Sequence, residues 1–123
     1  MKYLDKVLEI NEIDGQHRGA ASKEYLAAKE RVKELPISLG EDAEMMLSNH
    51  LMALIKRISL GQFVDPVEEE MMSEVSEKAW EYAGKIVNPL FEAHGIPVDK
   101  SELFLVGTHM EMAIASAEAV QQV

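Results

Sequence analysis

Apolar residues recur along this chain at the spacing of α-helices. The apolar–polar alternation of a half-buried strand is absent, and the helix-forming residues Ala, Glu, Leu, Lys and Met dominate. The pattern predicts an all-α fold in which five or six helices form one compact bundle. No internal repeat or low-complexity tract divides the chain, so a single domain over residues 1–123 is expected.

Three helices are expected in the first half of the chain. The first covers about residues 2–13, and the second runs from about 22 to 35, where Pro36 ends it because the residue before a proline avoids helical geometry. The third is expected over 41–60, with Gly61 as its C-terminal cap.

A proline-containing start signal predicts the next helix. Asp65 is placed as an N-cap, Pro66 as the first helical residue, and Glu68 for a capping box. Pro89 is expected to kink or restart this helix, and Gly95 to end it. Its predicted apolar stripe consists of Met71, Val75, Ala79, Ala83, Ile86 and Leu90.

The spacing of Asp99 and Glu102 repeats the capping pattern before another apolar segment. This pair predicts a last helix that runs to about residue 119. The expected number of helices therefore depends on whether Pro89 divides the preceding one.

Composition excludes several classes of protein. The chain contains no cysteine, so disulfides, thiolate metal sites and cysteine nucleophiles are excluded. No apolar stretch approaches the ~18 residues that a membrane span requires. The first residues, MKYLDKVLEINEID, have no hydrophobic signal core. A soluble, cytoplasmic protein is expected.

The formal net charge of −10 is carried by one part of the chain. Residues 1–35 have seven basic and seven acidic side chains, whereas residues 36–123 have five basic and fifteen acidic ones. Such a surface repels phosphate backbones and anionic lipid headgroups. Direct binding to nucleic acid or to a membrane is therefore not expected.

The four histidines are the first candidates for chemistry. His17 lies in a polar loop, and His94 precedes a glycine at a helix end, where a structural role is expected. His50 falls on the apolar face of its predicted helix, and Arg57 follows two helical turns later on nearly the same azimuth. Two interpretations stay open: a packed core histidine with an arginine that extends to solvent, or an anion site.

His109 lies in a similar position, within the apolar part of the last predicted helix. Gly107 leaves room for another backbone to approach the helix, and Thr108 adds a hydroxyl beside the imidazole. Three residues could serve as metal ligands: His50, His109 and Glu111. Neither histidine, however, has a second ligand at i+3 or i+4, the spacing at which helices usually pair their ligands. No metal site and no cofactor are expected, and no nucleotide-binding or serine-elbow motif is present.

Two motifs resemble the signatures of the PTS regulation domain (PRD) family. SNHLMALIKR, with His50 and Arg57, resembles the first, in which an arginine follows the histidine by seven residues. SELFLVGTHMEMAIASA, with His109, resembles the second. The segment between them, FVDPVEEEMMSEVSEKAWEYAGKI, resembles the family's central helices. The resemblance is strongest over residues 40–120, and Asn49 stands where the family commonly has Asp.

The resemblance implies a regulatory role. PRD domains occur in bacterial antiterminators and transcription activators, and act through dimer packing. They are phosphorylated on histidine by the phosphocarrier protein or by enzyme II components of the sugar phosphotransferase system. Carried onto this chain, the phosphoacceptors are His50 and His109, Arg57 is the charge partner, and Asn49 and Thr108 are supporting residues.

The same family resemblance sets the expected partners. Full-length regulators of this kind carry two such domains after a nucleic-acid-binding module, which this chain lacks, so a stand-alone module with a transcription-regulator partner is expected. The leading hypothesis is a non-enzymatic homodimer that is phosphorylated on histidine. The alternatives are a helical scaffold whose histidines only pack, and an enzyme that uses His50 and His109 as an acid–base pair.

Overall fold

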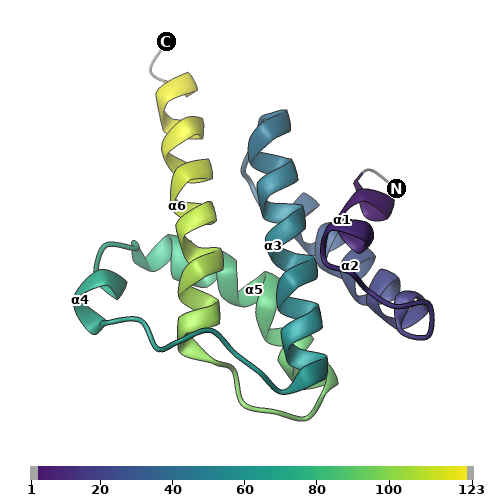
Figure 1. Cartoon of the computed structure of the whole chain (residues 1–123). Helices are drawn as coiled ribbons and strands as arrows, with labels where there is room; N and C mark the ends of the chain where they lie inside the picture. Colours follow the sequence, from purple (N-terminus) through teal and green to yellow (C-terminus); the bar gives the residue numbers. More distant parts are fainter. Residues whose placement is uncertain (1–2, 122–123) are drawn as a thin grey trace.

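The computed structural model describes residues 3–121, and their side chains as far as Ser116. Over this range the chain forms six helices and no strand, which confirms the all-α prediction (Figure 1). The helices are α1 (Leu4–Ile10), α2 (Arg18–Lys33), α3 (Glu41–Leu60), α4 (Glu69–Met72), α5 (Glu77–Ala93) and α6 (Lys100–Gln121).

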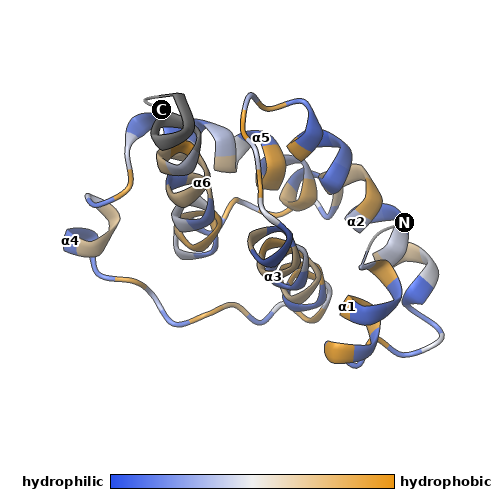
Figure 2. Ribbon diagram, turned by 90° about the horizontal axis from the view of Figure 1, so that it is seen from above, coloured by the Kyte–Doolittle hydropathy of each residue, from blue (hydrophilic) through white to orange (hydrophobic). Residues whose placement is uncertain are grey.

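Helices α3 and α6 stand side by side, and α5 crosses behind α6 (Figures 1 and 2). Helix α3 also packs against α1 and α2, and α2 packs against α5. The core between these elements is apolar and almost entirely closed to solvent. Its fully buried side chains include Val7, Tyr25, Leu47, Leu51, Met52, Leu54, Ile86, Phe91, Val106 and Met110.

The ends of several helices follow the sequence signals. Gly61 has the left-handed φ of 68° that a C-terminal cap requires, and Gly95 has a φ of 66° after α5. Asp99 caps α6, because its Oδ1 accepts the backbone N–H of Glu102 at 3.0 Å. Pro89 does not interrupt α5, which continues through it as one helix.

The predicted start at Asp65 is wrong. No helix begins at Pro66; the segment stays irregular until the single turn of α4, and α5 begins only at Glu77. The reason is tertiary, since the Val64 and Val67 N–H groups donate to Glu102 and to the Ser101 hydroxyl at the start of α6. These bonds hold the segment along α6 in place of helical geometry.

Two other helices also have boundaries that differ from the prediction. Helix α2 begins at Arg18 rather than near residue 22, and α1 is shorter than predicted, covering only Leu4–Ile10. The earlier start of α2 follows a local signal, because Asp14 accepts the N–H of His17 at 3.0 Å, one residue before the helix. Residue 2, where α1 was predicted to begin, lies outside the described residues.

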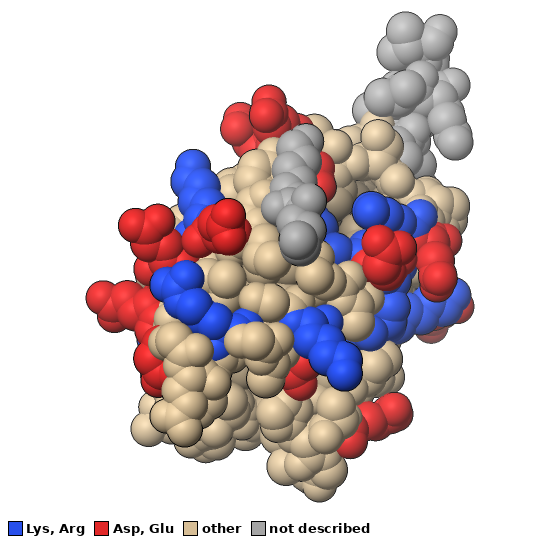
Figure 3. Space-filling view, turned by 90° about the vertical axis from the view of Figure 1, so that its right-hand side faces the viewer, with Lys and Arg blue, Asp and Glu red and all other residues tan. Residues whose placement is uncertain are grey.

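Charge is well mixed on the face that carries α1 and α2. Lysine and arginine side chains alternate there with aspartate and glutamate, without a large patch of one sign (Figure 3). This agrees with the equal numbers of basic and acidic side chains in residues 1–35.

Candidate functional site

The fold brings the two candidate histidines, which lie 59 residues apart, into direct contact. His50 projects from α3 and His109 from α6. Their ring centroids are 5.1 Å apart with an interplanar angle of 75°, and His109 Nε2 lies 3.4 Å from His50 Nδ1. The two signature motifs therefore build one site.

Helical register explains why the two rings meet at the edge of the core. In α3, Leu47, Leu51 and Leu54 are fully buried, and His50 lies beside this stripe at intermediate exposure. In α6, Val106 and Met110 occupy the corresponding buried positions, and His109 lies beside them. Each imidazole thus borders both the core and the solvent.

Arg57 lies on the same side of α3 and forms a two-point ion pair with Glu102. Its Nε donates to Oε2 at 2.6 Å and its Nη2 donates to Oε1 at 2.8 Å. The Glu102 side chain is fully buried, whereas that of Arg57 is 25% exposed. Sequence reasoning assigned Glu102 only to a capping box and missed this role. The sequence did contain a signal for this role, because Glu102 is an acidic residue at the start of an otherwise apolar helix.

An open depression of about 290 Å³ lies over these groups. It is lined by Met46, Asn49, His50, Ala53, Arg57 and His109. The two imidazoles and the guanidinium therefore face one space, which is large enough for a tetrahedral anion.

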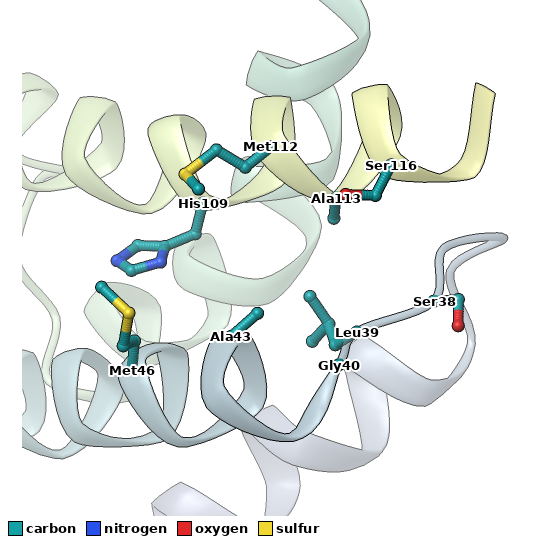
Figure 4. A pocket seen from close by; sticks show the side chains of 9 residues that line it. All are labelled: Ser38, Leu39, Gly40, Ala43, Met46, His109, Met112, Ala113 and Ser116. Carbon is teal, nitrogen blue, oxygen red and sulfur yellow. The ribbon is translucent and has the colours of Figure 1, made fainter. Parts of the chain in front are cut away.

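A narrower apolar pocket adjoins this depression between α3 and α6 (Figure 4). Met46 projects into it from α3 and Met112 from α6, on either side of His109. These two methionines are 59% and 66% exposed. The histidine pair is consequently bordered by exposed apolar surface.

Both histidines are held in the neutral form near pH 7. Burial, together with the neighbouring His109 and Arg57, lowers the pKa of His50 to about 4, against an opposing influence of Glu102. Burial also lowers the pKa of His109. Each ring therefore keeps one nitrogen with a free electron pair, which is the form that acts as a nucleophile.

One hydrogen bond joins the two rings, and the other nitrogen of His50 is buried without a partner. Among the described residues, His50 Nε2 is the one buried side-chain nitrogen or oxygen without a hydrogen-bond partner. Whether this nitrogen is protonated or not, it forgoes a hydrogen bond, at a cost of about 1–3 kcal/mol. The contact between His50 Nδ1 and His109 Nε2 needs a proton on one of these two nitrogens, and either ring can supply it.

The two predicted supporting residues bond to other groups. Asn49 borders the depression, and its Oδ1 accepts the side-chain amide of Asn11 in the loop after α1 at 2.9 Å. The Thr108 hydroxyl donates to the Leu105 carbonyl of its own helix at 2.6 Å. Asn49 thus borders the site, whereas the Thr108 hydroxyl is bonded within its own helix.

The other histidines lie elsewhere, in local ion pairs. His17 is 2.7 Å from Asp14, and His94 Nε2 is 2.6 Å from Glu24. Glu111, weighed as a metal ligand with the histidine pair, instead accepts the Ser76 N–H at 2.6 Å. Among the residues with described positions, no three His, Asp or Glu side chains gather as metal ligands.

Gly107 is approached closely by a side chain and not by the backbone that was expected there. A Cβ atom at this position would meet Val75 Cγ1 at 3.2 Å, so the missing side chain lets Val75, just before α5, pack against α6. Within residues 3–121, the structure has no helix whose length and apolar character would let it cross a bilayer.

Comparison with known proteins identifies the family. The PRD domain profile matches residues 29–113, which is more than half of the chain. Comparisons with curated proteins and with solved structures gave no match. The matched segment includes His50, Arg57, Glu102 and His109, the four residues of the site described above. This chain therefore belongs to the PRD family.

Proposed function

We propose that this chain is a phosphorylatable regulatory module of the bacterial sugar phosphotransferase system, with His50 and His109 as its phosphoacceptors. PRD domains are regulatory rather than catalytic, and are controlled by components of that system. The observation that carries the proposal is the meeting of two neutral imidazoles and Arg57 in one open depression.

The chemistry needs only a neutral imidazole and a donor. An unprotonated ring nitrogen attacks the phosphorus of a phosphohistidine on the phosphocarrier protein or of a phosphorylated enzyme II component. The new N–P bond forms as the donor's bond to phosphorus breaks, and the donor leaves with that electron pair. The proton on the acceptor's other nitrogen can pass to the donor or to water.

Arg57 is suited to the role of charge partner even though it is paired. Glu102 accepts from its Nε and from one hydrogen of Nη2, whereas a guanidinium has five N–H donors. The hydrogens on Nη1 remain for phosphoryl oxygens. Glu102 orients the guanidinium, and the partial exposure of Arg57 leaves its outer edge toward the depression.

The orphaned nitrogen of His50 argues against the scaffold alternative. A histidine that only packs should have both ring nitrogens satisfied by neutral groups, but His50 Nε2 is buried without a partner. The enzyme alternative has less support, because Glu102, the carboxylate that reaches this site, is held by Arg57.

The proposed readout is a change in dimer packing in the cytoplasm. Met46 and Met112 place exposed apolar surface next to the acceptor histidines, and we assign this surface to a homodimer seam. A phosphoryl group adds a charge of about −1.5 to −2 there, which weakens apolar packing. The net charge of −10 disfavours direct nucleic-acid binding, so control of transcription or antitermination runs through a regulator partner.

Phosphotransfer from purified components tests the proposal. The wild-type chain is incubated with enzyme I, phosphocarrier protein and labelled phosphoenolpyruvate, with and without enzyme II components. His50→Gln, His109→Gln and the double variant are compared with His17→Gln, which changes an exposed histidine outside the site. Acid-labile label that persists in His17→Gln and disappears in the double variant supports the proposal. Absence of label with every donor on folded wild-type protein contradicts it.

A further inference from the structure

We infer that His50 and His109 form a single-occupancy acceptor. Either imidazole can carry the phosphoryl group, but the pair holds only one at a time, and the unmodified ring becomes its hydrogen-bond donor. This inference rests on the proposed function and specifies how the same site is regulated.

The two rings are too close to hold two phosphoryl groups between them. His109 Nε2 and His50 Nδ1 face each other at 3.4 Å, and the other nitrogen of His50 is buried in the protein. A phosphoryl group on either facing nitrogen takes the space of the present His–His contact. Modification of one ring therefore separates the pair and brings phosphoryl oxygens next to the other ring.

A phosphoryl group on one ring changes the protonation of the other ring. In the unmodified site both imidazoles are neutral, because burial lowers both pKa values. A neighbouring dianion has the opposite effect and favours a protonated imidazole. The acceptor ring releases its proton to the donor or to water, and the second ring takes up a proton from water because the dianion beside it raises its pKa. Once protonated and bonded to the phosphoryl oxygen, the second ring has no electron pair left for a second transfer.

Little positive charge is available at the depression to pair with phosphoryl groups. Arg57 lines the depression, and two of its five N–H groups already donate to the buried Glu102 carboxylate. Lys56, on the same helix, donates to the Asn11 carbonyl at 2.7 Å, and Lys29 donates to Ser48 and Glu44. One partly neutralised guanidinium can accompany one phosphoryl group, whereas two groups this close would repel each other strongly in a half-buried site.

Intact-mass spectrometry at neutral pH tests occupancy directly. The protein is phosphorylated to completion with enzyme I, phosphocarrier protein and excess phosphoenolpyruvate, and phosphoryl groups are counted on each chain. We expect one group at most on wild type, one on His50→Gln, one on His109→Gln and none on the double variant. His17→Gln should match wild type.

The possible failures can be told apart. Two groups on a wild-type chain overturn the single-occupancy inference and leave the proposed function intact, provided that both are lost in the double variant. Acceptance by only one of the two single variants also overturns it, because one histidine would then be the sole acceptor. No phosphorylation of wild type by any donor overturns the inference together with the proposed function.

A second measurement needs no substitution at the site. Proteolytic mapping of phosphorylated wild type should find the group on either the His50 or the His109 peptide, although no intact chain carries two. Nitrogen-15 NMR of the imidazoles should show the unmodified ring of the pair protonated at pH 7, while His17 keeps its unphosphorylated spectrum. A neutral second ring would overturn the assigned hydrogen bond.

Discussion

At the scale of single residues, Glu102 and Arg57 depend on each other for the stability of their charges. The carboxylate has no solvent contact and is neutralised by two short bonds from the guanidinium. Removing one partner of a buried pair leaves the other charge uncompensated, which costs far more than breaking an ion pair in water. The position of Arg57 beside the histidines therefore depends on a residue that faces away from solvent.

We expect Glu102→Gln to lower the free energy of unfolding by about 2–4 kcal/mol, because Arg57 loses its counter-charge in a largely buried setting. Urea denaturation measures the change. Glu81→Gln, which removes an exposed pair with Lys85, is the matched control and should cost less than about 0.5 kcal/mol. Equal losses in the two variants would contradict the importance assigned to the buried pair.

The histidine pair predicts a pH dependence of stability. The pKa of His50 is about 4 in the folded chain and about 6.5 when unfolded, so the unfolded state binds more protons between these values. The stabilisation is fully present above about pH 6.5 and is lost as the pH falls toward 4. The lowered pKa of His109 acts in the same direction.

The measurement is the difference between wild type and His50→Gln in urea denaturation across pH 4 to 7. Taking the difference removes the shared titration of carboxylates. We expect the wild type to lose up to about 2–3 kcal/mol more than the variant on acidification, after allowance for the partial exposure of the ring. Parallel pH curves would show that His50 has no lowered pKa in the folded state.

At the scale of helices, tertiary contacts decided where α5 begins. Pro66 follows a good N-cap residue, yet the backbone before α4 is engaged by Ser101 and Glu102 of α6. Ser76 caps α5 instead, and its hydroxyl oxygen accepts the Ala79 N–H at 3.2 Å. Contacts with α6 keep the backbone at the predicted start out of a helix, so α5 begins after Ser76.

This assignment predicts different costs for the two candidate caps. Ser76→Ala should lower the free energy of unfolding by about 1 kcal/mol, because it removes a hydrogen-bonded N-cap. Asp65→Ala should change it by less than about 0.5 kcal/mol, since no helix begins there. Thermal or urea unfolding measures both, and a larger loss at Asp65 would restore the start predicted from sequence.

At the scale of the whole molecule, the site lies where α3 and α6 stand side by side (Figure 1). Charge added between them acts on the interface of two helices and on the exposed methionines beside it. A small covalent change can thus alter the surface offered to a second copy without altering the fold. This is the physical link between the proposed phosphorylation and the proposed dimer.

We expect Met112→Glu to weaken self-association at least about tenfold, because it places a charge in the proposed apolar seam. Met71→Glu, at a methionine that is 48% exposed and outside the lining of the site, is the matched control and should leave association unchanged. Sedimentation measures both variants. Equal dimerisation of wild type and Met112→Glu would exclude this face as the seam.

Much of the architecture follows from sequence periodicity. The all-α class, the span of α3 and its Gly61 cap, the Asp99 cap and the apolar stripe of α5 from Ala79 to Leu90 depend on residues close in the chain. The predicted stripe was wrong at its start, because Met71 and Val75 lie before α5 and Met71 is exposed. Helical geometry alone determines how such neighbours lie. The same register placed His50 and Arg57 on one face of α3, and the two signature motifs pointed to the family before any contact was known.

Other features required the tertiary structure, because they join residues distant in the chain. No periodicity shows that His50 and His109 share a hydrogen bond, that Glu102 binds Arg57, or that α6 holds the segment before α4 out of a helix. The pKa of His50 likewise depends on burial between packed helices. The sequence alone determined the all-α class, most of the helical segments and the candidate histidines, whereas packing decided which side chains meet, because short-range geometry carries no information about long-range contacts.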